Sequence, residues 1–286
     1  MSVAQTRQSG HSGGVTEDRQ SAPMTHAAAA LADALYTCVI EGALIEAPVD
    51  PISLDEAYAV QSEVFEKREI QLAGWKLATT SGTAQKAMGL SCPIVGRLAG
   101  PDILWARREV EAPRGPVYAE AELAVTLHSN LPARSEPYGA REVAAAIGEV
   151  HAAIELCSSR YADDDVDAAP LIADNAFAYR LVLGRALAIG WHPRFAAMTV
   201  SLDCGAGRTI NGSTAAVMGN PINAVTWLAN WLSRRGLGLR SGQVVATGSC
   251  TGIVRLDAGD AVRALFAGQE GVAATITSRT PIGRNG

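Results

Sequence analysis

The segment Val117-Tyr-Ala-Glu-Ala-Glu-Leu-Ala-Val-Thr-Leu127 alternates between two residue series, and this alternation predicts a β-strand with two very different faces. One series is apolar and suits a core: Ala119, Ala121, Leu123, Val125 and Leu127. The other series places Glu120 and Glu122 side by side, about 6.6 Å apart along the strand. Either this second face meets water, or the two carboxylates converge on a cation, because paired bare carboxylates are costly to bury.

Composition excludes several classes of protein. The chain has 286 residues, of which 48% are hydrophobic and 19% charged, as expected of a soluble globular protein. A net charge of -5 without a Lys/Arg cluster excludes a nucleic-acid binder. The five cysteines form no C-x-x-C pair, so we expect neither a disulfide framework nor a zinc site, but thiols packed as small apolar groups.

Neither a membrane span nor a secretory signal is predicted. No apolar run approaches the roughly 20 residues that cross a bilayer. The first residues have no hydrophobic segment behind them, so we expect a cytoplasmic protein. Residues 1–23 are rich in Ser, Gly, Gln and Thr, which predicts a disordered tail.

Patterning divides the rest of the chain into a helical region, 24–70, and a β-rich catalytic domain, 71–286. Residues 25–45 are rich in Ala and Leu, and Ser53-Leu-Asp-Glu56 is a capping box that begins a second helix. Further helices are predicted over residues 141–153 and after Asn220-Pro221. Strands are predicted around residues 74–79, 179–183, 198–202, 244–247, 262–266 and 272–277. Helices followed by mostly short strands indicate an α+β fold.

Glu155 is a third acid in an otherwise apolar segment, Ala152-Ala-Ile-Glu-Leu156. Alone it is equally consistent with a surface position at the end of a strand. Together, Glu120, Glu122 and Glu155 would supply three oxygen ligands to a hard divalent cation and leave octahedral positions open. These segments lack the imidazole and thiolate pattern of a zinc or copper site.

The same residues resemble the fumarylacetoacetate hydrolase superfamily, and within it the 2-keto-4-pentenoate hydratase and 4-oxalocrotonate decarboxylase branch. The motifs that carry the resemblance are Tyr118-Ala-Glu-Ala-Glu-Leu-Ala124, His151-Ala-Ala-Ile-Glu155 with Ser159-Arg160, Ile172-Ala-Asp-Asn-Ala176, Gly74-Trp-Lys76 and Met218-Gly-Asn-Pro221. The resemblance implies a mixed β-roll of the C-terminal-domain type of that superfamily, with an N-terminal helical layer. It also implies homo-oligomers and 2-oxo or 2-enol acid substrates from the catabolism of aromatic compounds.

Residue roles follow from the resemblance position by position. Glu120, Glu122 and Glu155 match Mg²⁺ or Mn²⁺ ligands, and Lys76 matches an active-site lysine. Three glutamates and one divalent cation sum to -1, so an anionic substrate needs added positive charge, which Lys76 and Arg160 are candidates to supply. Lys76 is otherwise a surface residue at a strand end, and Arg160 is equally a structural partner of Asp163 or Asp174. The residues assigned to the substrate pocket are Ser81, Asp174, Asn175 and Phe177.

Two positions depart from the pattern of the branch. No proton-transfer group stands at Ile94 or Val95, and Phe177 follows Asp174-Asn-Ala176 where relatives usually carry serine. These changes would hinder delivery of water or a proton and leave a metal chelate intact. We therefore predict a divalent-metal-dependent lyase for an unsaturated 2-oxo acid, by hydration or decarboxylation. The alternatives are a C–C bond hydrolase of acylpyruvates and a catalytically silent relative that binds an oxo acid.

Overall fold

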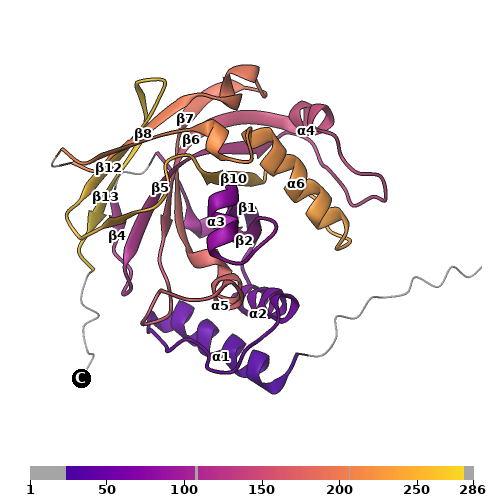
Figure 1. Ribbon diagram of the computed structural model, residues 1–286, viewed down its shortest axis with the longest axis vertical. Helices are drawn as coiled ribbons and strands as arrows, with labels where there is room; N and C mark the ends of the chain where they lie inside the picture. Colours follow the sequence, from indigo (N-terminus) through magenta and orange to yellow (C-terminus); the bar gives the residue numbers. More distant parts are fainter. Residues whose placement is uncertain (1–23, 107–108, 206, 280–286) are drawn as a thin grey trace, which may run out of the picture.

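The computed structural model describes residues 24–106, 109–205 and 207–279. The tail predicted over residues 1–23 and the last seven residues of the predicted β-domain therefore lie outside it. The described chain forms two β-sheets accompanied by short helices, so the α+β prediction is confirmed (Figure 1). No helix within the described ranges combines the length and apolar character that a membrane crossing requires.

The larger sheet has eight strands, and it curves so that one face becomes an interior. Its strands run in the order β2-β1-β10-β5-β6-β7-β3, with β11 also paired to β5. Their bounds are β1 Leu72–Ala78, β2 Ile94–Ala99, β3 Ile103–Trp105, β5 Val117–Leu127, β6 Ile147–Cys157, β7 Ala178–Ile189, β10 Val244–Ser249 and β11 Val254–Leu256. The predicted strand is thus β5, which lies in the middle of this sheet.

β5 and β6 form a long antiparallel pair whose register sets the position of the acidic residues. Glu120 lies directly opposite Glu155, and Ala121 lies opposite Ile154. The helix predicted over residues 141–153 is confirmed only up to residue 146, because α4 (Ala140–Ala146) ends where β6 begins. Alanine favours a helix locally, but β6 forms backbone ladders with β5 on one side and β7 on the other. Tertiary pairing therefore overrides the intrinsic preference.

The smaller sheet covers the outer face of the larger one. It has the order β4-β13-β12-β8-β9, with bounds β4 Glu109–Glu111, β8 Thr199–Asp203, β9 Thr209–Ser213, β12 Ala261–Phe266 and β13 Gln269–Thr277. The apolar series of β5 joins side chains of β6, β8, β12 and β13 in one core cluster. Since that series faces the second sheet, Glu120 and Glu122 must point into the concave side of the first.

Helices close the other side of the molecule. The bounds are α1 His26–Glu41, α2 Leu54–Lys67, α3 Gly82–Ala87, α5 Ala168–Ala173 and α6 Pro221–Ser233. α1, α2 and α5 lie together below the curved sheet (Figure 1) and share an apolar cluster with Ile94 of β2. The predicted capping box is confirmed, because the Ser53 hydroxyl accepts from the Glu56 amide at 3.2 Å and the Glu56 carboxylate accepts from the Ser53 amide at 2.9 Å. Because Ile94 of β2 packs against these helices, the helical region 24–70 and the predicted β-domain share one apolar cluster.

The two sheets approach closely at a pair of glycines, Gly184 and Gly271, and this contact generates a test. A Cβ at Gly184 of β7 would lie 2.1 Å from the carbonyl oxygen of Gly271 and 2.9 Å from Cβ of Val272. We expect Gly184→Ala to destabilise the protein by about 1–3 kcal/mol or more, because the sheets must separate to admit the methyl group. Urea unfolding followed by circular dichroism measures the loss.

Gly82→Ala is the matched control for this substitution. Gly82 is the first residue of α3, and a Cβ there meets nothing within 4 Å. Alanine is the better helix former, so this variant should be unchanged or up to about 1 kcal/mol more stable. Equal stabilities of the two variants would contradict the proposed role of the glycine contact.

Candidate metal centre

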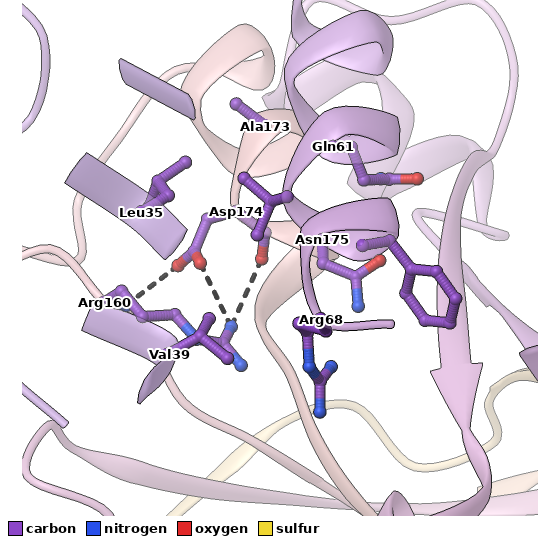
Figure 2. Close-up of a pocket in the computed structure, with 10 residues that line it drawn as sticks. Leu35, Val39, Gln61, Arg68, Arg160, Ala173, Asp174 and Asn175 are labelled. Atoms are coloured by element: carbon purple, nitrogen blue, oxygen red, sulfur yellow. Dashed lines mark hydrogen bonds and ion pairs between the residues drawn. The ribbon is translucent and has the colours of Figure 1, made fainter. Parts of the chain in front are cut away.

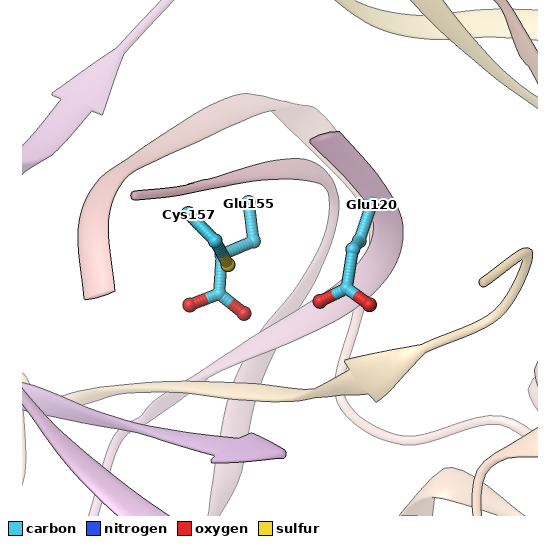
Figure 3. Close-up of side chains that lie close together, drawn as sticks. All are labelled: Glu120, Glu155 and Cys157. Atoms are coloured by element: carbon cyan, nitrogen blue, oxygen red, sulfur yellow. The ribbon is translucent and has the colours of Figure 1, made fainter. Parts of the chain in front are cut away.

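Three side chains from the middle of the larger sheet converge on its concave face. One ligand atom from each of Glu120, Glu155 and Cys157 lies within 4.8 Å of the others (Figure 3). Glu155 and Cys157 are two residues apart on β6 and so share a face, and Glu120 faces Glu155 from β5. Glu122 follows Glu120 on the same face of β5. The residues that meet most closely thus include a thiol in addition to two of the three predicted acids.

Glu120 and Glu122 are held in surroundings that favour their neutral form unless a cation is present. Burial and the neighbouring Glu155 carboxylate raise the pKa of Glu120 to about 7. Burial, followed by Glu155 and Glu120, raises the pKa of Glu122 well above its ordinary value. Glu122 is 0% exposed and Glu155 is 1% exposed. Bringing a divalent cation between such groups removes both the repulsion and the lack of solvation.

Orphaned oxygen atoms provide an independent test of whether a cation fits. Oε2 of Glu155 and Oε1 of Glu122 are buried without a hydrogen-bond donor in the described structure, and Oε1 of Glu155 has only the ion pair with Lys76. Buried polar atoms in native proteins are nearly always partnered, so the two unpartnered oxygens indicate a missing partner. Carboxylate oxygens are the ligands that Mg²⁺ and Mn²⁺ prefer. The donor set therefore fits a hard divalent cation.

Lys76 projects from β1 into the same interior and is 1% exposed. Its Nζ lies 3.1 Å from Oε1 of Glu155 and donates a hydrogen bond of 2.7 Å to the carbonyl oxygen of Ala176. Burial alone would lower the pKa of this ammonium, but Cys157, Glu155 and Glu120 outweigh it and raise the pKa above its ordinary value. The alternative of a surface lysine is excluded, and Lys76 is a fixed cation beside the acids.

A strained turn holds the Lys76 ammonium in place. The turn η2 (Asn175–Phe177) has three consecutive residues with left-handed backbone, at φ values of 54°, 51° and 57°. The Asn175 side chain fixes this turn to β2 by accepting from the Arg97 amide at 2.7 Å and donating to the Arg97 carbonyl at 2.8 Å. Gly96 permits the approach, since a Cβ there would lie 2.8 Å from both the Asn175 carbonyl oxygen and Cγ of Lys76. Asn175, predicted to line the substrate pocket, thus supports the turn that contacts Lys76.

A bulge in β10 supplies a further contact that the sequence did not reveal. The pairing of β10 with β5 shifts register between Ala246 and Ser249, and Gly248 adopts φ 114° there. The Gly248 amide donates to Oε2 of Glu122 at 3.0 Å. Hydrogen bonding by the Ser249 side chain offsets part of the rise in the pKa of Glu120. In the sequence, Gly248 is only a strand-ending glycine. Nothing there indicates that its amide turns toward an acid 126 residues earlier in the chain, on the neighbouring strand β5.

Arg160 and Asp174 form a separate arrangement near the N-terminal helices. The Arg160 backbone amide donates to Asp174 at 2.8 Å, and its guanidinium lies 3.1 Å from the same carboxylate. The guanidinium also donates to the Asp174 and Ala178 carbonyls, and Leu35 and Val39 of α1 lie beside it (Figure 2). Within the described residues, no hydrogen bond or ion pair joins Arg160 to the glutamates. Of the alternatives weighed from sequence, these contacts favour a structural partner of Asp174.

The other predicted pocket residues have local structural roles. The Ser81 hydroxyl caps α3 by accepting from the Ala84 amide at 3.1 Å. Phe177 packs against the apolar cluster of α1, α2 and α5, in which Ile94 is buried. His151 lies on β6 and points to the same side of the sheet as Glu155, whereas the predicted helix over residues 141–153 would have included it. Four residues of strand separate them by about 13 Å, which excludes a shared cation.

No family model matches the chain. A curated relative, the 2-keto-4-pentenoate hydratase of Burkholderia vietnamiensis (strain G4 / LMG 22486), is 32% identical over 232 residues, which cover 77% of this chain and 85% of the relative. The chain belongs to the 2-keto-4-pentenoate hydratase and 4-oxalocrotonate decarboxylase family. The resemblance inferred from the Glu120, Glu155 and Asp174 motifs is therefore confirmed, and the family consists of lyases.

Solved structures agree with this family assignment. The 4-oxalocrotonate decarboxylase from Pseudomonas putida G7, complexed with magnesium and adipate, superposes with a TM-score of 0.79 at 26% identity, covering 87% of this chain and 97% of that one. A protein assigned to the fumarylacetoacetate hydrolase family from Yersinia pestis CO92 shares the fold at a TM-score of 0.52 and 18% identity, over 71% of this chain and 91% of its own. The predicted β-roll fold is therefore confirmed.

Removal of one acid tests the cation site. Millimolar Mg²⁺ should raise the thermal unfolding temperature of the wild type, because an ion at 100 times its Kd adds about 2.7 kcal/mol to the folded state. Glu155→Gln and Glu122→Gln should lose this increase. Glu149→Gln is the control, since Glu149 is also on β6 but its side chain is 48% exposed. An undiminished Mg²⁺ effect in Glu155→Gln would reject the assignment.

Stability against pH tests the environment of Asp174. Burial, against the opposing effect of Arg160, raises the pKa of Asp174 from 3.8 to about 6. The folded state therefore binds this proton more tightly than the unfolded chain, so the contribution of Asp174 to stability falls as pH rises from about 4 to about 6. Relative to Asp174→Asn, the wild type should lose up to about 3 kcal/mol across that interval. Urea unfolding at closely spaced pH values measures the difference, and a constant difference would contradict the raised pKa.

Proposed function

We propose that this protein is a divalent-metal-dependent lyase that decarboxylates or hydrates an unsaturated 2-oxo acid, in the catabolism of aromatic compounds. The observation that carries the proposal is the convergence of Glu120, Glu155 and Lys76 on one buried face, with Glu122 beside them. The relatives named hydratase and decarboxylase support the reaction class. The decarboxylase complexed with magnesium and adipate supports both a divalent cation and a small carboxylic acid as ligands.

Glu120, Glu122 and Glu155 would hold Mg²⁺ or Mn²⁺ in this proposal. The cation supplies Lewis-acid stabilisation of the negative charge that develops on the keto oxygen of the substrate. Three carboxylates and the Lys76 ammonium have a formal charge of -2, which one divalent cation cancels. A neutral, buried centre can then accept the carboxylate of a 2-oxo acid group without accumulating a large charge of one sign.

Lys76 would bind the substrate and donate a proton to it. An ammonium has three N–H donors, of which one faces Glu155 and one is bonded to the Ala176 carbonyl. The third remains for the carboxylate or keto oxygen of an incoming acid. Since neighbouring acids raise its pKa, Lys76 is charged at neutral pH and acts as a proton donor or electrostatic stabiliser rather than as a base.

Decarboxylation is favoured over hydration by the surroundings of the turn. Hydration requires a group that delivers water and a second that returns a proton to carbon. Ile94 and Phe177 offer neither, and both belong to the apolar cluster beside α2 and α5. Hydrolysis of an acylpyruvate is disfavoured more strongly, because it needs a water-activating base and His151 lies about 13 Å of strand from Glu155.

We also propose that the chain forms a homo-oligomer in the cytoplasm. Val49, Trp105 and Ile189 are 97%, 55% and 89% exposed, and a subunit interface would remove such apolar surface from water. Sedimentation of the purified protein as a monomer would contradict the first part, and fractionation of cells tests the second.

Two substrates separate the candidate reactions. With Mg²⁺, hydration of 2-hydroxypenta-2,4-dienoate bleaches the diene absorbance without gas release, whereas decarboxylation of 4-oxalocrotonate releases CO₂. We expect CO₂ release. Failure of both assays, with oxalate still binding in a metal-dependent way, would favour a catalytically silent relative over an enzyme.

Lys76→Met tests the role of the ammonium in whichever reaction is found. Turnover should fall by about 10²–10⁴-fold, as expected for loss of a positioned proton donor. The Mg²⁺-induced rise in unfolding temperature should persist, because Lys76 is not a cation ligand. Lys86→Met, at an exposed position of α3, is the matched control. Full activity of Lys76→Met would remove Lys76 from the mechanism.

A further inference from the structure

Cys157 stands where a cation ligand would stand, although the sequence suggests only a small apolar filler. Its Sγ forms the group of mutually close ligand atoms together with Glu120 and Glu155, whereas Glu122 is held by the Gly248 amide. Figure 3 shows the thiol and the Glu155 carboxyl group side by side on β6, with the Glu120 carboxyl group opposite. Cys157 is 3% exposed, so the thiol is enclosed in the same interior as the acids.

We infer that Cys157 makes this centre a mixed oxygen–sulfur site that captures thiophilic divalent cations such as Zn²⁺, Co²⁺ and Cd²⁺. This inference rests on the same carboxylates as the proposed lyase site. It adds that the ion selectivity of the centre differs from that of an all-oxygen site, because a sulfur ligand discriminates strongly in favour of softer ions over Mg²⁺.

The geometry suits such an ion. At tetrahedral angles, bonds of about 2.0–2.2 Å to carboxylate oxygen and about 2.3 Å to sulfur place two ligand atoms of one ion about 3.3–3.7 Å apart. The three ligand atoms lie within 4.8 Å of one another, so small rotations of the side chains complete the contact. Three protein ligands with one open position are the usual arrangement of a zinc ion that also binds a small molecule.

A second observation, independent of the thiol, shows that the site has room to coordinate a cation. Oε2 of Glu155 is buried without a hydrogen-bond donor, while Lys76 Nζ lies 3.1 Å from Oε1, so the carboxylate retains a free coordination site. On binding, a bond forms between Sγ and the ion, and the thiol proton is released to solvent. The products are then a thiolate ligand and a hydrated proton, with no change of oxidation state.

Cadmium is the probe, because a cadmium–thiolate bond produces an ultraviolet charge-transfer band that oxygen ligands do not. The titration uses a Cys92→Ser background, since Cys92 is exposed and the other four cysteines are buried. We expect the band to saturate at one Cd²⁺ per chain. Excess Mg²⁺ should move the titration to higher Cd²⁺ concentration, because both ions need Glu120 and Glu155.

Variants identify the thiol responsible. Cys157→Ser in this background should lose the band and at least about tenfold in Cd²⁺ affinity, since even residues behind a metal ligand cost 10–100-fold. Cys204→Ser removes a buried thiol that directly follows β8 of the smaller sheet, and this variant should retain both. Should Cys157→Ser fail to fold, Glu120→Gln keeps the thiol and should still weaken the titration.

The outcomes separate this inference from the proposed function. A wild-type protein that turns over substrate with Mg²⁺ but shows no band, or a band that survives Cys157→Ser, overturns the inference and leaves the lyase proposal intact. A Cys157-dependent band in a protein that turns over neither substrate overturns the lyase proposal and leaves the mixed site.

Discussion

Glu120 lies directly opposite Glu155 in the β5–β6 ladder, and the rest of the centre depends on this pairing of two acids. Two carboxylates directly opposite each other in a buried sheet repel, and a third from Glu122 adds to the effect. The fold tolerates this only because positive charge is supplied locally. Lys76 on β1 supplies part of this positive charge. Although β10 and β5 lie between β1 and β6, the concave shape of the sheet brings its ammonium within 3.1 Å of Glu155.

Register is the second requirement, and the outer face of the sheet enforces it. A slip of one residue along β5 would turn the acids into the apolar core and the apolar series into the interior. The close contact of Gly184 with Gly271 and the packing of β12 and β13 on the apolar faces of β5 and β6 make that slip costly. The polar centre is therefore positioned by apolar packing on the opposite side of the same strands.

Much of this organisation could be predicted from the sequence, and the parts that could not share a physical cause. Alternation in β5, the capping box at Ser53 and the apolar setting of Glu155 are local signals, and they located the strand, the helix and the third acid. The switch from α4 to β6 at Ile147 was missed, since alanines favour a helix until two neighbouring strands are present. The sequence predicts Cys157 only as a packed apolar thiol, because the strand register is needed to show that its thiol lies close to Glu120.

Contacts made by backbone atoms could not be predicted from the sequence either. The Gly248 amide and the Ala176 carbonyl belong to no side chain, and their directions arise from a bulge and from a left-handed turn. Residue identity says little about either. Arg160 shows the limit of a motif, because the sequence left it open between a charge for the substrate and a partner of Asp174, and only the structure shows the ion pair with Asp174.

The turn at Ala176 has one more consequence. Since the atom that holds Lys76 is a main-chain oxygen, replacing the side chain at this position leaves the anchor chemically intact. Ala176 is buried in the apolar cluster, so both the space for a side chain and the backbone preference limit substitution there, with glycine accepted and β-branched residues refused at φ 51°. Scanning mutagenesis with alanine would record nothing at residue 176, yet the ammonium on which the centre relies would lose its position if that single peptide turned over.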